Sequence, residues 1–348
     1  MKIAQVGHLG VSVPPEKYGG SERVLSYLTE ELVRLGHDVT LFASGDSTTT
    51  AKLRPMCARA LTHTPFVNRD ALLFHMLEHV WNVSHEFDII HSHLDFVGFP
   101  LARRSEVPLI TTLHGYLDAP ELVEVYREFW EIPLVSISHS QRAPFRFNNW
   151  MANVYHGIPA HLYPYHPRSA GYLAFLGRMS PEKSPDVAIR IAKEAGIPLR
   201  LAAKVDPVDQ EYFETEIVPL LADPLIQFVG EITDHEKADF LGNACAVLCP
   251  YQPEAFGLVL IEALACGTPV VTYRHGSFPE LIDHESTGFL CTNEQEMVHA
   301  VRCIGELDRG RCHQIFEERF TAEQMTTQYI QVYESMIKEP AVASFADE

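Results

Sequence analysis

Two runs of alternating strand-like and helix-like segments, separated by a Pro- and His-rich stretch, constrain the fold of this chain more than any other feature. In the first run, DVTLFAS (38–44) and LITTLHG (109–115) are apolar segments typical of buried strands, and residues 21–35 have the apolar spacing of an amphipathic helix. The stretch HGIPAHLYPYHP (156–167) predicts a linker, after which the alternation begins again with YLAFLGR (172–178). Strands that alternate with helices predict a parallel sheet covered by helices on both faces.

The sequence therefore predicts the α/β class, with two doubly wound, Rossmann-like domains that face each other across a cleft. We place the first domain at residues 1–160 and the second at residues 161–320. Residues 321–338 are expected to form a final helix that packs on one of the two. Ligands of doubly wound sheets bind at the carboxyl ends of the strands, so we look for site residues there.

The composition excludes several classes of protein. Hydrophobic residues make up 46% and charged residues 21% of the chain, which is typical of a globular protein. Lys and Arg total 27 against 46 Asp and Glu, a formal net charge of −19, and this acidic balance disfavours nucleic acid and anionic lipid as partners. The seven cysteines form no Cys-x-x-Cys pair, which favours reduced thiols. With no apolar run near the ~20 residues of a membrane span, we expect a cytoplasmic protein without stable membrane association.

A dinucleotide-binding dehydrogenase would share this fold class, but two features disfavour it. The first predicted strand is followed by Gly-x-x-Gly (7–10) and then by two prolines, in place of a Gly-x-Gly-x-x-Gly motif that leads into a helix. The second strand does not end in an acidic residue for a ribose 2′-hydroxyl, because Asp46 lies two residues beyond it.

The stretch PEAFGLVLIEALACGTPVV (253–271) contains two glutamates with seven residues between them. Glu262 lies one turn inside an apolar helix, where a carboxylate is costly to bury without a partner, and two ribose hydroxyls would satisfy it. The backbone N–H groups of Leu258 and Val259, after Gly257, offer an anion site for a diphosphate. Glu254, just before, could reach a sugar beyond the phosphates. The alternative is that Glu262 faces solvent and Glu254 is an ordinary surface acid.

GRMSPEK (177–183) supplies two cations after the strand that opens the second domain. Both can lie at the cleft, where the Arg178 guanidinium could grip a phosphate in bidentate fashion and Lys183 would add a point charge. The alternative is a strand-end arginine and a helix-capping lysine.

PPEKYGGSER (14–23) places Gly19 and Gly20 between a strand and a helix, where the lack of a Cβ lets the backbone approach a ligand. Ser21 could cap the helix that follows, and Gly36 could supply the left-handed residue at its end. A plain tight turn is the alternative for the two glycines.

Histidines follow two strands of the first domain. His114 in TTLHGY should lie at the carboxyl edge of the sheet, although a lone histidine is more often structural. HSHLD (91–95) could suggest metal ligands, but we expect the imidazoles of His91 and His93 to point to opposite faces of the strand, which disfavours a metal site. His91, His93 and Asp95 are instead expected to line the side of the cleft where a second substrate, the acceptor, would bind.

PEAFGLVLIEALACGTPVV, with GRMSPEK upstream of it, resembles the signature of family 4 of the retaining glycosyltransferases, which have the GT-B fold. The resemblance implies that Glu254 contacts hydroxyls of the donor sugar and that Glu262 holds the nucleotide ribose. It also implies that Arg178 and Lys183 stabilise the leaving diphosphate in place of a metal ion, and that His114 lies near the reacting sugar.

The resemblance covers nearly the full chain and adds two features. FVGEIT (228–233) resembles the segment that holds the nucleotide base through its backbone, and the helix at 321–338 resembles one that returns to the first domain. The catalytic set so implied is His114, Arg178, Lys183 and Glu254, and the donor-binding set is Gly19, Gly20, Gly230, Ile232, Phe256, Gly257, Leu258, Val259 and Glu262.

The function predicted from the sequence is transfer of a hexose, glucose or mannose, from a UDP- or GDP-sugar to an acceptor hydroxyl, with retention of configuration. It needs no metal and no cofactor beyond the nucleotide sugar itself, and the acceptor is a sugar or a small molecule. The alternatives are a nucleotide-sugar-binding protein without transfer activity, a sugar-nucleotide epimerase, and a phosphorylase, which would need a pyridoxal lysine. The acceptor, the donor nucleotide, the linkage and the oligomeric state stay open.

Overall fold

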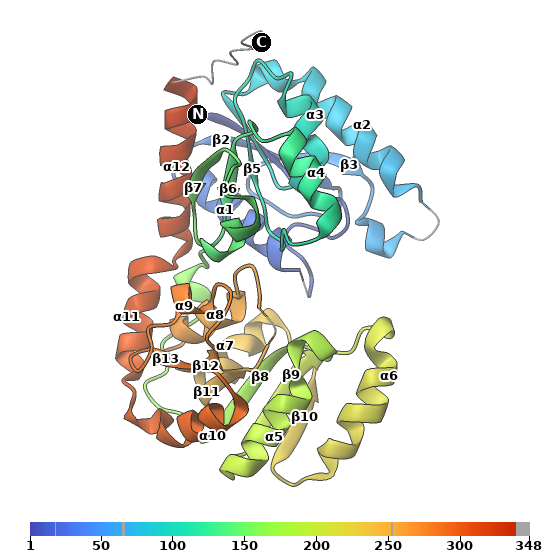
Figure 1. The fold of residues 1–348 in the computed structure, drawn as a ribbon. Helices are drawn as coiled ribbons and strands as arrows, with labels where there is room; N and C mark the ends of the chain where they lie inside the picture. The colour runs from blue at the N-terminus through green and yellow to red at the C-terminus, as the bar shows by residue number, and fades with distance from the viewer. Residues whose placement is uncertain (18, 65–66, 252, 339–348) are drawn as a thin grey trace. The chain divides into compact units, whose positions relative to one another are not determined.

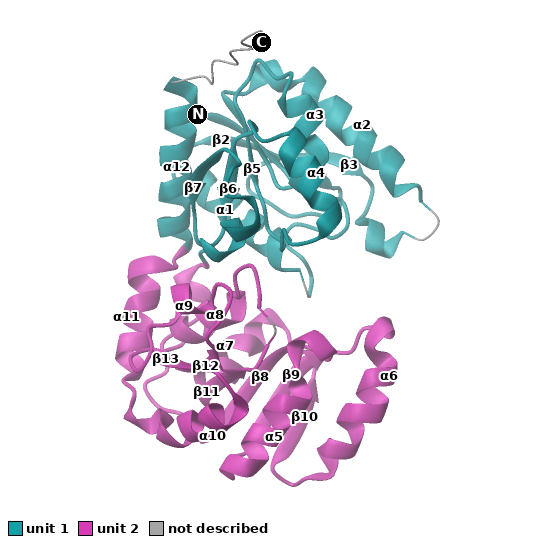
Figure 2. Cartoon of the chain, viewed as in Figure 1, with its two compact units in different colours: residues 1–157, 322–348 teal, residues 158–321 magenta. Residues whose placement is uncertain are grey.

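The computed structural model describes residues 1–17, 19–64, 67–251 and 253–338, which form two compact units (Figure 2). The first unit comprises Met1–Gly157 and the C-terminal segment from Ala322, and the second comprises Ile158–Thr321. The corresponding boundaries predicted from the sequence were residues 160 and 320. The described helices include none that is both long and apolar enough to span a bilayer.

The first unit is built on a parallel sheet with strand order β3-β2-β1-β4-β5-β6-β7. Its strands are β1 (Lys2–Val6), β2 (Asp38–Ser44), β3 (Lys52–Cys57), β4 (Ile89–Ser92), β5 (Leu109–Thr112), β6 (Leu134–Ser136) and β7 (Trp150–Asn153). Its α-helices are α1 (Gly20–Arg34), α2 (Arg69–Asn82), α3 (Phe99–Ala102), α4 (Pro120–Glu128) and α12 (Ala322–Lys338) (Figure 1). The strand order reverses between β1 and β4, so the carboxyl ends of these neighbouring strands flank a crevice-forming switch point.

The second unit repeats this architecture with the order β10-β9-β8-β11-β12-β13, again with parallel pairs. Its strands are β8 (Tyr172–Arg178), β9 (Leu199–Lys204), β10 (Ile226–Gly230), β11 (Ala244–Cys249), β12 (Val270–Tyr273) and β13 (Gly288–Cys291). Its α-helices are α5 (Pro185–Ala195), α6 (Gln210–Tyr212), α7 (Asp234–Gly242), α8 (Leu258–Ala265), α9 (Phe278–Leu281), α10 (Glu294–Cys303) and α11 (Arg309–Arg319). Here the switch point lies between β8 and β11.

Burial explains why the central strands are apolar along their whole length. In β2 six consecutive residues are buried, and in β8 the first five are buried, because helices cover both faces of each sheet. The prediction of two doubly wound α/β sheets is therefore confirmed.

The helix at the end of the chain belongs to the first unit. Helix α12 packs against α1, and Tyr329 and Tyr333 on its inner face are fully buried. The hydroxyl of Tyr333 accepts a hydrogen bond of 3.2 Å from the side-chain amide of Gln5 on β1. Residues more than 300 positions apart in the sequence thus share one core.

The start of α1 differs from the prediction. The helix begins at Gly20 with Gly19 at its N-cap, and Ser21 lies inside the first turn, where its hydroxyl donates to Glu22 over 3.0 Å. Ser21 is therefore not the cap, because the chain already turns into the helix two residues earlier. The prediction for the other end is confirmed, since Gly36 has a φ of +84°.

Candidate active site

Two cations lie at the carboxyl end of β8, beside the switch point of the second unit. Arg178 is the last residue of β8, and Lys183 ends the short turn that follows it. The Arg178 guanidinium forms an ion pair with Glu182 and lies 3.8 Å from the carboxylate of Asp206, after β9. Both cations thus lie at the edge of the sheet where the sequence predicted them.

Lys183 joins this edge to the loop that follows β11. Its ammonium forms an ion pair with Glu254 and lies 4.7 Å from the centroid of the Tyr251 ring. The Tyr251 hydroxyl donates to the carbonyl of Leu176 on β8, which holds the ring in place. Burial lowers the pKa of Lys183 to about 8, with a smaller contribution from the nearby Arg178 charge. An anion that replaced Glu254 would therefore meet a largely desolvated ammonium group.

The loop from Glu254 to Gly257 leads into the N-terminus of α8. Gly257 is the N-cap with a φ of +111°, and a Cβ there would lie 3.2 Å from the ring of Phe278, so both the backbone angle and the space favour glycine. The hydroxyl of Ser277 donates to the carbonyls of Glu254, over 2.9 Å, and Phe256. This bracing fixes the loop, and it places the N–H groups of Leu258 and Val259 in the first turn of the helix.

Glu262 is buried on α8. The structure corrects the argument that this buried carboxylate needs ribose hydroxyls as its partners. Its side chain is 3% exposed, so the alternative of a solvent-facing acid is wrong. Its Oε1 accepts a hydrogen bond of 2.8 Å from the Tyr163 hydroxyl and lies 3.0 Å from the ammonium of Lys237 on α7. The burial of this carboxylate therefore does not by itself require a ribose. Neither partner was predicted from the sequence.

Gly230 and Ile232, the predicted base-contacting residues, lie at the end of β10 and in the turn before α7. Gly230 has a φ of +81°, a conformation that favours glycine. Thr233 caps α7 in a reciprocal capping box with Glu236, and Lys237 on the next turn reaches Glu262. The turn is thus connected to the candidate donor site through α7.

In the first unit, Gly19 packs tightly within its own loop. A Cβ added there would lie 2.9 Å from Cβ of Pro15, so the loop's packing alone requires glycine. This supports the tight-turn alternative for Gly19 and leaves the ligand-facing role of Gly19 and Gly20 as a prediction.

The prediction that His91 and His93 point to opposite faces of β4 is wrong. Their ring centroids lie 4.1 Å apart, because side chains two residues apart in a strand share a face. All four ring nitrogens have partners: those of His91 bond to Tyr333 and Thr112, and those of His93 bond to Gln5 and His114. These hydrogen bonds, rather than the strand geometry, argue against a metal ligand role.

His114 lies two residues beyond β5, at the predicted edge of the first sheet. Its Nε2 lies 2.8 Å from Nδ1 of His93, and its ring stacks on His156 with centroids 5.2 Å apart. Burial lowers the pKa of His114 to about 3, so the ring is neutral at physiological pH. A neutral imidazole offers one donor and one acceptor nitrogen to its surroundings.

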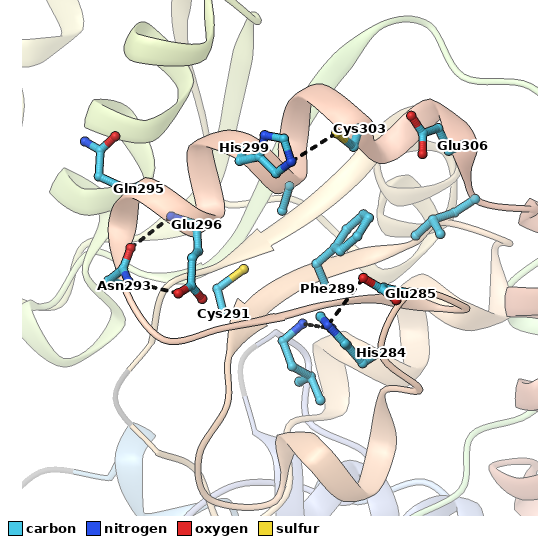
Figure 3. Close-up of a pocket in the computed structure, with 13 residues that line it drawn as sticks. His284, Glu285, Phe289, Cys291, Asn293, Gln295, Glu296, His299, Cys303 and Glu306 are labelled. Atoms are coloured by element: carbon cyan, nitrogen blue, oxygen red, sulfur yellow. Dashed lines mark hydrogen bonds and ion pairs between the residues drawn. The ribbon is translucent and has the colours of Figure 1, made fainter.

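A cavity of about 940 Å³ lies elsewhere in the second unit, between β13 and α10 (Figure 3). Its lining includes His284, Glu285 and Glu296, as well as His299 and Cys303, whose side chains lie 3.7 Å apart. Its lining residues include none of the predicted site residues. The cavity is therefore separate from the candidate site at β8 and β11.

Family models match most of the chain in two consecutive parts. The model described as Glycosyltransferase Family 4 matches residues 18–180, and the model described as Glycosyl transferases group 1 matches residues 166–315. The second match contains all the cations and glutamates at the candidate site of the second unit.

Two curated relatives are similar over shorter stretches. The chain is 34% identical over 136 residues to D-inositol 3-phosphate glycosyltransferase of Saccharomonospora viridis, a match that covers 36% of this chain and 32% of that protein. It is 34% identical over 156 residues to GDP-mannose-dependent alpha-(1-6)-phosphatidylinositol dimannoside mannosyltransferase of Mycobacterium tuberculosis, covering 43% of this chain and 40% of that protein. The chain thus matches between about a third and two fifths of the length of these relatives.

The fold itself agrees over a much longer part of the chain. The crystal structure of HepE from Anabaena, in complex with UDP and glucose, has a TM-score of 0.72 and 20% sequence identity, and covers 96% of this chain and 100% of that chain. The GT-B fold is therefore confirmed. Since the family models account for both units in turn, the chain belongs to family 4 of the glycosyltransferases.

Proposed function

We propose that this protein transfers a hexose, glucose or mannose, from a UDP- or GDP-sugar to a hydroxyl of a sugar or small-molecule acceptor, with retention of configuration. The reaction uses the nucleotide sugar as co-substrate and requires neither a metal ion nor another cofactor.

One observation carries this proposal: Arg178, Lys183 and Glu254 come together at the carboxyl ends of β8 and β11, on either side of the switch point. Two cations at a ligand-binding edge suit a diphosphate, whose negative charge increases as the glycosidic bond breaks. The N-terminus of α8, directly after Glu254, adds N–H donors for the same group. These charges do the work that a bound metal ion does in other transferases.

The ion pair between Lys183 and Glu254 suggests how the donor enters. We infer that the diphosphate replaces Glu254 as the partner of Lys183 and that the released carboxylate accepts hydrogen bonds from hydroxyls of the sugar. The desolvated ammonium gains a stronger anionic partner, and Glu254 orients the sugar ring. His114, which the family resemblance implies lies near the reacting sugar, is proposed to contact a hydroxyl of that sugar. The departing phosphate helps to deprotonate the acceptor hydroxyl on the face that it leaves, which gives retention.

The donor class is supported by the relatives. One is named for its dependence on GDP-mannose, and HepE was crystallised with UDP and glucose. The predicted contacts to the base come from the backbone around Gly230 and Ile232, and such contacts suit either nucleotide.

The test is a turnover assay with UDP- and GDP-linked glucose and mannose, with and without a panel of sugar acceptors. Release of UDP or GDP that depends on acceptor, with a product of the donor's anomeric configuration by NMR, supports the proposal. Binding of donors without release of nucleotide would instead identify a sugar-nucleotide-binding protein. Conversion of the donor into an isomer that keeps its nucleotide would identify an epimerase.

A further inference from the structure

A chain of hydrogen bonds crosses the interior of the first unit and ends at His114. Gln5 on β1 and His93 just after β4 are both buried, at 0% and 2% exposure. Nε2 of His93 lies 2.9 Å from Oε1 of Gln5, and Nδ1 of His93 lies 2.8 Å from Nε2 of His114. These three residues are called the Gln5–His93–His114 chain below.

The side chain of Gln5 determines which nitrogen donates and which accepts in each hydrogen bond of the Gln5–His93–His114 chain. The amide oxygen of Gln5 can only accept a hydrogen bond, so Nε2 of His93 must carry the proton. A neutral His93 then has a bare Nδ1, which accepts, and Nε2 of His114 must donate to it. A neutral His114 is left with a bare Nδ1.

Helix α12 holds the Gln5 amide in this orientation. The amide nitrogen of Gln5 donates to the hydroxyl of Tyr333 over 3.2 Å, so its oxygen faces His93. The Tyr333 hydroxyl in turn lies 2.6 Å from Nδ1 of His91, to which it can donate. Rotation of the amide by half a turn would reverse every donor and acceptor along the chain.

The end of the chain is an acceptor with no partner of its own. Nδ1 of His114 is buried and has no hydrogen-bond partner among the described residues. Burial lowers the pKa values of His93 and His114, which keeps both rings neutral and the direction of the chain defined. A buried acceptor without a partner costs free energy unless a ligand group donates to it.

We propose that Gln5 is a positioning residue for the transfer reaction: through His93 it holds His114 in the Nε2–H tautomer, which leaves Nδ1 to accept a hydrogen bond from a hydroxyl of the donor sugar. The inference rests on the proposed function, since it needs a sugar beside His114. It gives a role to two buried side chains that the proposed mechanism does not otherwise use.

The direct test is a ¹⁵N NMR measurement on histidine-labelled, donor-free protein. Imidazole nitrogens with and without a proton have well-separated shifts, and the signals of His114 are assigned by their loss in His114→Asn. We expect a neutral His114 protonated at Nε2. Protonation at Nδ1 in the wild-type protein would overturn the proposal, and the His114→Asn variant serves only to assign the signals.

The variant Gln5→Met tests the link to Gln5. It keeps a similar volume but removes the acceptor, so neither direction of the chain is favoured and His114 should populate both tautomers. We expect kcat/KM for the sugar nucleotide to fall about twofold, in proportion to the fraction of His114 that keeps the Nε2–H form, while affinity for free UDP or GDP is unchanged. Ser136→Ala is the control, because it also removes hydrogen bonds of a buried side chain in the first unit, to the partly buried Arg142 and Asn153, away from the Gln5–His93–His114 chain. It should lower the melting temperature but leave the His114 tautomer and kcat/KM unaltered.

The results separate this inference from the function on which it rests. A Gln5→Met protein that keeps His114 wholly in the Nε2–H form, or that changes tautomer at unchanged kcat/KM, overturns the role of Gln5 while transfer stands. A wild-type protein that turns over no sugar nucleotide overturns the proposed function, and with it the role in catalysis, whatever the NMR shows.

Discussion

Replacing Glu262 by glutamine removes a negative charge that is already paired in the donor-free protein. Its Oε1 accepts from the Tyr163 hydroxyl over 2.8 Å and lies 3.0 Å from the ammonium of Lys237. Lys237 is itself mostly buried, and its other ion pair with a described residue is a longer contact, 3.4 Å, to the partly exposed Asp234. The carboxylate therefore connects α8 to α7 and to the segment before β8, and we expect the substitution to weaken the second unit even without a ligand.

The geometry sets the size of the effect. A glutamine oxygen in the same place still accepts both hydrogen bonds, so the loss is the difference between charge-assisted and neutral bonds, about 1 kcal/mol. The ammonium of Lys237 keeps Asp234 but loses its nearer anion, which adds a similar amount. The total of about 2 kcal/mol corresponds to a melting temperature lower by about 4–8 °C for a unit of this size.

The assay compares thermal unfolding of donor-free Glu262→Gln with Glu318→Gln, the same chemical change at an exposed position that accepts from Gln314 on the surface of α11. The control should melt within about 1–2 °C of the wild type, as surface substitutions usually do. Calorimetric titration with UDP and GDP follows on the same proteins, and a ribose contact predicts weaker binding of both free nucleotide and intact donor. If Glu262→Gln melts like the control but loses nucleotide affinity, the carboxylate serves the ligand alone and its role in packing α8 against α7 is refuted.

Four further outcomes follow from the same site. Glu254→Gln should leave the affinity for free UDP or GDP almost unchanged while turnover falls and donor sugars are less well distinguished; a loss of nucleotide affinity by titration would contradict this. Lys183→Ala and Arg178→Ala should each lose about 3 kcal/mol of barrier stabilisation, roughly a hundredfold in turnover, whereas Lys204→Ala, which removes a more exposed lysine paired with Asp206 at 2.6 Å, should stay near the wild-type rate. Turnover should survive EDTA, and a loss that Mn²⁺ or Mg²⁺ restores would refute the metal-independent mechanism. Burial lowers the pKa of Lys183 to about 8, so the donor-free protein loses this charge as pH rises through 8. We therefore expect kcat/KM for the donor to fall above that pH. If Lys183→Arg shows the same fall at the same pH, the titrating group is not Lys183.

The central strands could be predicted from the sequence because their signal is local. β2 and β8 were predicted with the bounds that the structure shows, since strands covered on both faces are apolar along their length. The edge strands β3, β7 and β13 were missed. KLRPMC of β3 contains Pro55, and none of its residues is fully buried, because only one side of an edge strand is paired. Its sequence therefore lacks the pattern that identified the others.

In the candidate site too, some positions could be predicted from the sequence and others could not. The positions of Arg178, Lys183 and Glu254 at strand ends follow from short motifs and from the rule that parallel sheets bind ligands at their carboxyl edge. The partners of Glu262 do not follow, because Tyr163 lies 99 residues before it and Lys237 lies 25 residues before it, and only packing brings them together. Likewise, the position of His114 after a strand could be predicted from the sequence, but its contacts with His93 and His156 could not.

The sequence by itself determined the fold class, the order of the main elements and the types of charge at the edge of the second sheet, since each depends on periodicity or on residues close together in the chain. Only the tertiary structure decided which buried groups pair: that Glu262 meets Lys237, that His91 and His93 share a face with bonded nitrogens, and that Gln5 and Tyr333 lie at the far end of the His114 chain. The physical reason is that a buried charge or tautomer is set by whichever donor or acceptor packing brings within about 3 Å, and separation in the sequence does not limit that choice.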